Sequence, residues 1–147
     1  MTYLLDVNVL IALIDPLHVH HEEAHFWFAA NGHASWATCP LTENAAMRIV
    51  GHPSYPNFPG SPAAVAPILL QMRTLSGHQF WPDEFSLLNT EFVDVARLLS
   101  AGQLTDTYLL GLARVRGGQL ASFDRRMVVD AVNGGRETLH LISGWQA

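Results

Sequence analysis

Four acidic residues in the sequence lie where their carboxylates can belong to one site. Asp6 and Asp124 each follow a short apolar run, and Glu43 and Asp106 each stand near the start of a helical pattern. Two carboxylates about 4 Å apart repel each other by about 4 kcal/mol at an effective dielectric constant near 20. A divalent cation turns that repulsion into binding, and oxygen-only ligands favour Mg²⁺ or Mn²⁺ over zinc. If the acids converge, they predict metal-dependent chemistry.

Each acid also has a structural interpretation of its own. Glu43 and Asp106 suit the positive end of a helix dipole. Asp124 precedes two arginines and suits a turn or an ion pair. Asp6 is harder to explain in this way, because leucine and valine residues surround it and a carboxylate in such a run needs a strong partner.

The elements that must position these acids alternate along the chain. The apolar patterns predict strands at residues 3–6, 34–39, 78–81, 119–124 and 138–142. They predict helices near residues 7–14, 19–30, 42–50, 62–75, 91–99 and 106–115. This alternation is typical of an α/β fold with a central parallel sheet of about five short strands flanked by helices. Residues 51–62, with four prolines and two glycines, form a loop rather than a linker, because residues 1–147 suit a single domain.

The predicted sheet brings two of the acids to one edge. Asp6 ends the first strand and Asp124 ends the fourth. Because the carboxyl ends of parallel strands share an edge, and ligands bind in the crevice beyond it, both acids belong at a binding site. The strands do not place Glu43 and Asp106 there. Helices that follow the same edge begin beside it, so all four carboxylates can meet.

The composition narrows the range of functions. Hydrophobic residues make up 49% of the chain and charged residues 14%, which indicates a compact globular protein. The net charge of −5 counts against a simple nucleic-acid binder with a basic stripe. A bound cation reverses the local field that a phosphate meets, which removes this objection for a metal-dependent enzyme. All 8 basic residues are arginine, and the lack of lysine counts against haloacid-dehalogenase-like phosphatases, response-regulator receivers and P-loop proteins.

The sequence also carries signals about the compartment. Its single cysteine, Cys39, cannot form a disulfide within the chain and fits a reducing environment. The N-terminus has no basic region, and Asp6 interrupts the apolar run that a signal peptide needs. No apolar run approaches the roughly 18 residues of a membrane helix. We therefore expect a soluble, cytoplasmic protein without a membrane partner.

Four short runs resemble the acidic motifs of PIN-domain nucleases. They appear in the order of that family and span nearly the whole chain: LLDVNVL (4–10), LTEN (41–44), LTDTYLL (104–110) and ASFDRR (121–126). More closely, the chain resembles the VapC-type toxins of bacterial toxin–antitoxin operons. The resemblance implies a PIN-like domain, metal-dependent RNA hydrolysis with Mg²⁺ or Mn²⁺, and an acidic quartet of Asp6, Glu43, Asp106 and Asp124. Asp6 and Asp106 are the strongest candidates for direct metal ligands.

The resemblance also implies supporting residues and partners. Asn8, Thr105 and Ser122 match polar positions beside the acids, where they orient carboxylates, bind phosphate, cap a helix or form a turn. Arg125 and Arg126 lie beside an acid and either bind RNA phosphates or are solvated. The expected partners are an RNA substrate, a cognate antitoxin and a second copy of the chain in a homodimer. A catalytically inactive PIN-like module that binds RNA or protein is the alternative.

Two further features of the sequence compete with this interpretation or add to it. His21-Glu22-Glu23-Ala24-His25 matches the H-E-x-x-H pattern of zinc proteases. We expect a solvent-facing, histidine-rich helix instead, because little chain precedes the motif and Glu23 is polar where a protease core is apolar.

Phe26, Trp27 and Phe28 are consecutive and together span roughly 200° around a helix, which is wider than an ordinary apolar stripe. One of these rings is expected to face outward, where a partner can cover it.

Overall fold

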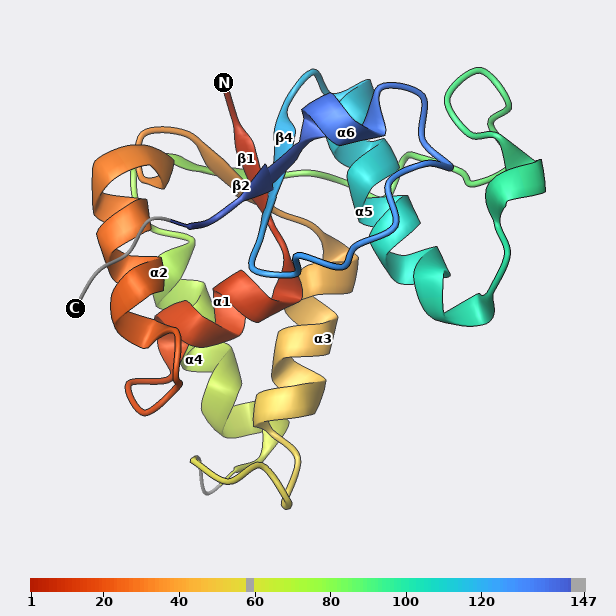
Figure 1. Cartoon of the computed structure of the whole chain (residues 1–147). Helices are drawn as coiled ribbons and strands as arrows, with labels where there is room; N and C mark the ends of the chain where they lie inside the picture. The colour runs from red at the N-terminus through yellow and green to blue at the C-terminus, as the bar shows by residue number, and fades with distance from the viewer. Residues whose placement is uncertain (58–59, 144–147) are drawn as a thin grey trace.

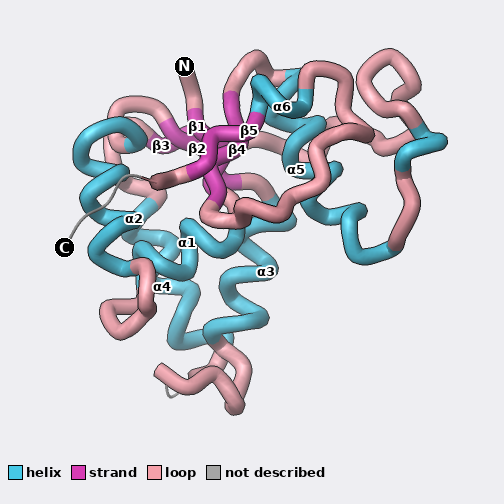
Figure 2. Tube along the Cα trace, in the orientation of Figure 1, coloured by secondary structure: helices cyan, strands magenta, loops and turns pink. Residues whose placement is uncertain are grey.

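The computed structural model describes residues 1–57 and 60–143, which form a five-stranded parallel sheet. The strand order is β3-β2-β1-β4-β5 (Figure 2). The strands are β1 Tyr3–Leu5, β2 Trp36–Thr38, β3 His78–Phe80, β4 Gln119–Ser122 and β5 Leu139–Leu141. Each lies within two residues of its predicted bounds, so the predicted α/β fold is confirmed. The predicted loop at 51–62 includes residues 58–59, which lie outside the described residues.

Helices cover both faces of the sheet (Figure 1). α1 to α4 pack on one face, and α5 and α6 lie on the other. The helices are α1 Val7–Ile14, α2 His21–Trp27, α3 Pro40–Val50, α4 Pro62–Met72, α5 Leu104–Val115 and α6 Gly135–Thr138, with a π-helical turn Phe28–Gly32 after α2. α6 is not among the predicted helices. None of the helices in the described residues has the length and apolar character needed to cross a lipid bilayer.

Local hydrogen bonds determine where two of the helices near the site begin. The Asp6 carboxylate accepts a hydrogen bond from the Val7 N–H at 2.7 Å and caps α1. α3 begins at Pro40, two residues before its predicted start, with proline at the first helical position. The Thr42 hydroxyl there accepts from the Cys39 N–H at 3.1 Å. Both caps follow strand ends, so both helices start at the carboxyl edge of the sheet.

The helix predicted at residues 91–99 is wrong. This segment forms turns and the short 3₁₀ helix Val95–Arg97, and Val93 forms an antiparallel bridge with Val132. The Asp94 carboxylate accepts a hydrogen bond from the Ala96 N–H at 3.1 Å. Such side-chain bonds to nearby backbone compete with helical hydrogen bonds, and here they divide an apolar pattern into turns.

The three consecutive aromatic residues have different surroundings. Trp27 is buried, with its ring centroid 5.2 Å from that of Tyr3 and its indole N–H donated to Nε2 of His140 at 3.0 Å. Phe28 is partly buried against the hydrophobic core between the sheet and α1 to α4. Phe26 is 60% exposed. The expectation that one ring faces outward is therefore confirmed, and that ring is Phe26.

The strand order identifies a natural binding position. β1 has β2 on one side and β4 on the other, so the direction of chain progression reverses between β1 and β4 (Figure 2). In open parallel sheets, ligands bind beyond the carboxyl ends of the strands at such a reversal. Asp6 directly follows β1, and Asp124 lies two residues after β4.

Candidate active site

Asp6 and Ser122 join the ends of β1 and β4 through a buried hydrogen bond. The Ser122 hydroxyl donates to Oδ2 of Asp6 at 2.7 Å, and the Val7 N–H donates to Oδ1. Asp6 is 6% exposed and Ser122 is fully buried. Each carboxylate oxygen of Asp6 therefore makes one hydrogen bond and keeps a lone pair for a further ligand.

Asn8 and Ser122 tie the loop after β4 to this carboxylate. The Ser122 hydroxyl accepts from Nδ2 of Asn8 at 3.2 Å and from the Asp124 N–H at 3.0 Å. Oδ1 of Asn8 accepts from the Phe123 N–H at 3.3 Å. A hydroxyl offers one donor and two acceptor positions, so the hydrogen-bonding capacity of Ser122 is fully used. These two polar residues, both predicted to support the acids, thus hold the loop of Asp124 beside Asp6.

Asp106, in the first turn of α5, shares its electrostatic environment with both other aspartates. Burial, followed by the charges of Asp6 and Asp124, raises the pKa of Asp106 to about 6. Burial also raises the pKa of Asp6; hydrogen bonds from Ser122 and Val7 offset part of this effect, and the charge of Asp124 adds to it. Carboxylates perturb one another in this way only when they lie close together in a partly dry environment. Ser122 links Asp6 to the backbone of Asp124, and Asp106 lies within electrostatic reach of both.

A second buried carboxylate shows what a structural acid looks like in this protein. Asp15 is 4% exposed and accepts hydrogen bonds from the Tyr55 hydroxyl, from Nδ2 of Asn57 at 3.0 Å and from a backbone N–H at 2.9 Å. Burial acts to raise the pKa of Asp15, but these hydrogen bonds hold it below its usual value. Asp6 and Asp106 have raised pKa values instead, which is typical of functional sites.

Glu43 makes its contacts with the end of β2 and with the end of α4. Its Oε2 accepts from the Thr38 hydroxyl at 2.7 Å and lies 3.6 Å from Nε of Arg73. Nε2 of His78 lies 2.7 Å from the same threonine oxygen. Since the single hydroxyl hydrogen is directed to Glu43, the histidine must donate its N–H. The role of Glu43 as a fourth metal ligand stays a prediction, because its contacts are with Thr38 and Arg73 and none of them joins it to the three aspartates.

The threonines on either side of Asp106 have opposite surroundings. Thr105, which the sequence singles out, is exposed. Thr107 is fully buried, and its hydroxyl has no hydrogen-bond partner among the described residues. A buried polar group without a partner is uncommon in folded proteins. The sequence pattern alone does not distinguish these two residues, because the burial of α5 decides which one is covered.

The carboxylates of the site can be compared with the ligands that a divalent cation needs. Within residues 1–57 and 60–143, no three histidine, cysteine, aspartate or glutamate side chains are arranged to hold one metal ion. Mg²⁺ does not require such a cage, because it keeps several waters and is held by one or two carboxylates together with substrate phosphates. Asp6 and Asp106 offer only oxygen donors and repel each other. They fit an open Mg²⁺ or Mn²⁺ site and do not fit a closed zinc site.

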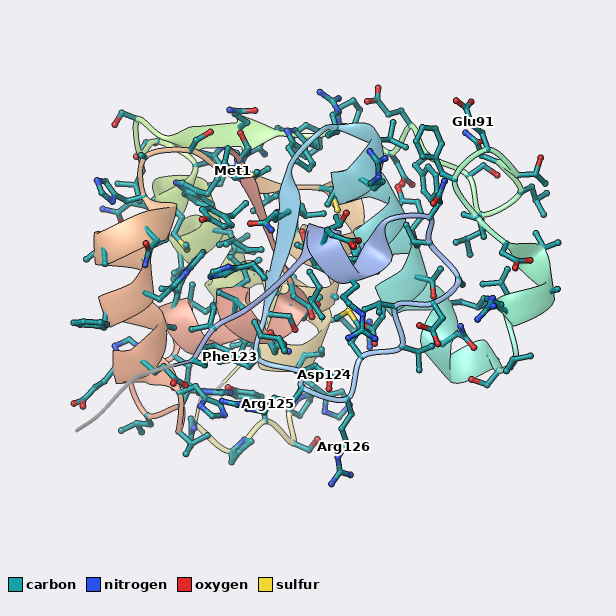
Figure 3. The ribbon with its side chains drawn as sticks, turned by 45° about the horizontal axis from the view of Figure 1, so that its top comes forward. Met1, Glu91, Phe123, Asp124, Arg125 and Arg126 are labelled. Carbon is teal, nitrogen blue, oxygen red and sulfur yellow. The ribbon has the colours of Figure 1, made fainter. Side chains whose placement is uncertain are left out.

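The loop after β4 carries exposed cations next to the acids. Figure 3 shows Phe123, Asp124, Arg125 and Arg126 in succession along this loop, with Arg126 projecting outward. Both arginines are exposed and form no ion pair with the residues that the structure describes. The Phe123 ring stacks on His20 with centroids 4.6 Å apart, a contact that the sequence does not predict. Exposed arginines beside an aromatic ring suit a substrate that carries negative charges and aromatic bases.

The protease-like motif has a structural role. Nδ1 of His21 lies 2.7 Å from the Ala12 carbonyl oxygen, and Nε2 of His25 lies 2.8 Å from that of Leu13. A carbonyl oxygen only accepts, so both rings donate their N–H. Ala12 and Leu13 belong to the last turn of α1, where carbonyls have no partner within the helix. The two histidines therefore cap the C-terminal end of α1.

The His21→Ala and His25→Ala variants are each expected to lose about 1–2 kcal/mol of unfolding free energy, because each leaves a helix-end carbonyl without its donor. RNA cleavage by the folded protein should be unchanged. Urea denaturation and a cleavage assay measure the two effects, with Glu22→Ala, an exposed residue of the same motif, as the control. Stoichiometric zinc in the wild type, lost together with cleavage in these variants, would contradict the capping role.

Comparison with known proteins shows relatives along most of the chain. It is 40% identical over 134 residues to Ribonuclease VapC44 of Mycobacterium tuberculosis, covering 91% of this chain and 94% of the relative. It is 40% identical over 139 residues to Ribonuclease VapC39 of the same organism, covering 95% and 100%. Ribonuclease VapC38 matches at 40% over 121 residues, covering 82% and 84%. No family model matches the sequence. The predicted resemblance is confirmed, and the chain belongs to the VapC family of ribonucleases.

Proposed function

We propose that this chain is a Mg²⁺-dependent endoribonuclease and the toxin of a toxin–antitoxin pair. The observation that carries the proposal is the trio of aspartates at the reversal point of the sheet, with Asp6 and Asp106 both raised in pKa. Their arrangement creates charge repulsion that a cation relieves, and a substrate phosphate can then complete the coordination of that cation. Membership of a ribonuclease family supports RNA as the substrate.

Asp6 and Asp106 are the proposed ligands of the ion, with Asp124 and Glu43 as further acids. Mg²⁺, when bound, supplies positive charge against the scissile phosphate and makes water a stronger acid. Asp124, which is half-buried, adds a third negative charge that favours a bound cation. Glu43 contributes at this site after its contact with Arg73 breaks, since that contact directs its carboxylate elsewhere.

The remaining polar residues of the site position these acids and the substrate. Ser122 and Asn8 fix the Asp6 carboxylate and the loop that follows β4, which orients the ligands before the ion binds. Arg125 and Arg126 are free to bind phosphates on either side of the cleaved bond. No side chain is required as a nucleophile. Water would form the new P–O bond while the P–O bond to one ribose oxygen breaks, and that oxygen would leave as a hydroxyl after taking up a proton.

A protein with this activity needs a restraint, which supports a cognate antitoxin as partner. Phe26 lies on α2 with 60% of its surface exposed, and it is a candidate contact either for an antitoxin segment or for a second copy of the chain. We propose both associations, an antitoxin complex and a homodimer. Light scattering of the purified chain measures the second directly.

The test is RNA cleavage by rigorously purified protein, with Mg²⁺ or with EDTA. We expect cleavage of single-stranded RNA with Mg²⁺ or Mn²⁺ and none with EDTA, and its restoration when Mg²⁺ is added back. The inactive PIN-like alternative predicts RNA or protein binding without cleavage under every condition. Cleavage that persists in EDTA would contradict the metal dependence.

A further inference from the structure

A cavity of about 350 Å³ lies along β5, beside the candidate active site. Leu141 of β5 is paired with Ser122 of β4, and Ser122 holds the Asp6 carboxylate. The cavity is therefore one strand away from the acids across the sheet. Its lining comes from the loop after β4, from α6 and from β5, and consists of Arg125, Met127, Val129, Arg136, Leu139 and Leu141.

The charged side chains of this cavity are all positive. Two of its lining residues are arginines, the others are apolar and none is acidic. Both arginines are exposed and have no ion-pair partner among the described residues. Arg73, Arg97 and Arg116 each pair with a carboxylate. The other arginines have no ion pair among the described residues, and Arg125 and Arg136 are the two of them that line one cavity together. In a chain of net charge −5, two unpaired guanidinium groups beside an apolar floor indicate a site for an anion with an apolar part.

We propose that this cavity binds a nucleotide of the RNA substrate next to the cleaved phosphodiester bond, an inference that rests on the proposed ribonuclease function. Arg125 and Arg136 bind the phosphate of that nucleotide. Met127, Leu139 and Leu141 form the floor against which its base or sugar packs. Single-stranded RNA presents unstacked bases that apolar side chains and guanidinium planes can contact.

The position of the cavity favours RNA over a peptide. Arg125 directly follows Asp124, so a strand with one phosphate at the acids brings a neighbouring nucleotide toward this arginine. A peptide strand added to β5 would use the backbone at the edge of the sheet, whereas the cavity offers cationic side chains that match a phosphate. Arg126 does not line the cavity and projects away from the loop (Figure 3).

The test measures RNA binding separately from cleavage. The Asp106→Asn variant serves as the background, and fluorescence anisotropy follows its binding of a short labelled single-stranded RNA with Mg²⁺ present. Adding Arg136→Gln or Arg125→Gln should weaken binding about tenfold, the effect of losing one charge-assisted contact. The slope of log K against log salt should also become shallower by about 0.7. Arg116→Gln removes the same charge at the far end of α5, about 15 Å from Asp106, and should leave both quantities unchanged.

The outcomes distinguish this inference from the proposed function. Unchanged affinity and salt slope in both arginine variants would overturn the nucleotide site, even if the wild type cleaves RNA. Unchanged RNA binding with weaker capture of the antitoxin encoded beside this chain would assign the cavity to a protein and also overturn it. An equal loss in the Arg116→Gln control would show a nonspecific charge effect and reject the site. Failure of the wild type to cleave RNA would instead reject the proposed function.

Discussion

The Asp106→Asn variant is expected to cleave RNA at least about 100-fold more slowly than the wild type at saturating Mg²⁺. Asparagine keeps the shape of the side chain but removes one of two proposed carboxylate ligands. The stabilisation of charge by a bound metal is worth several kcal/mol, and each 1.36 kcal/mol corresponds to a tenfold change in rate. Asp130→Asn, an exposed aspartate that lines a different cavity, should retain the wild-type rate.

The same substitution should stabilise the metal-free protein at neutral pH. The pKa of Asp106 is raised from 3.8 to about 6, so the folded protein holds this proton more tightly than the unfolded chain does. The unfolding free energy of the metal-free wild type therefore falls as the pH rises from about 4 to about 6, by at most about 3 kcal/mol. Asp106→Asn lacks this titration, and in EDTA near pH 7 it should be more stable than the wild type by about 1–3 kcal/mol.

Urea denaturation between pH 4 and pH 8 with EDTA measures this difference, and a parallel cleavage assay measures the rate. A folded Asp106→Asn protein with the wild-type cleavage rate would remove Asp106 from the site. A variant less stable than the wild type at neutral pH would show that the Asp106 carboxylate has favourable partners rather than the repulsion described above.

The layout of the sheet is predictable from sequence because short buried strands leave a local signal. All five strands appear as apolar or aromatic runs bounded by polar or glycine residues, and the alternation with helices indicates parallel pairing. The segment at 91–99 has a similar apolar content but is not a helix. Asp94 forms a local hydrogen bond to the Ala96 N–H, and Val93 pairs with Val132, a residue distant in the sequence. A periodic pattern does not record such competing contacts.

The site is predictable only as far as strand ends determine it. Asp6 and Asp124 follow β1 and β4, so the topology alone brings them near each other. The orientation of Glu43 depends on Thr38 and Arg73, which come from β2 and the end of α4, and no local pattern indicates these contacts.

The sequence around Arg136 likewise carries no signal of a binding role. It shares a cavity with Arg125 because β5 returns beside β4, although the two residues lie in separate segments. Asp15 is the opposite case. It is a buried acid that belongs to none of the four acidic motifs, and hydrogen bonds from Tyr55 and Asn57 give its carboxylate a structural role.

Asp6→Asn is expected to abolish both toxicity and RNA cleavage in cells. Asp6 is the most buried of the three aspartates and the one that Ser122 holds at the sheet reversal, so its charge should be indispensable for binding the ion. Asparagine keeps only one of the two acceptor oxygens, so it can accept from the Val7 N–H that caps α1 but loses the acceptor of the Ser122 hydroxyl. The variant should still fold, because removing the charge also removes the repulsion from Asp124 and the cost of burying a carboxylate. Expression of the wild type alone should arrest growth, and co-expression of the small protein encoded beside it should relieve the arrest.

The most direct test of this account is to map RNA 5′ ends in cells before and after induction of the wild type and of Asp6→Asn, at matched protein levels. The account predicts new, discrete 5′ ends within RNA molecules after induction of the wild type and none after induction of Asp6→Asn. The same new ends in both strains, or none in either, would contradict the claim that these carboxylates make the chain a ribonuclease.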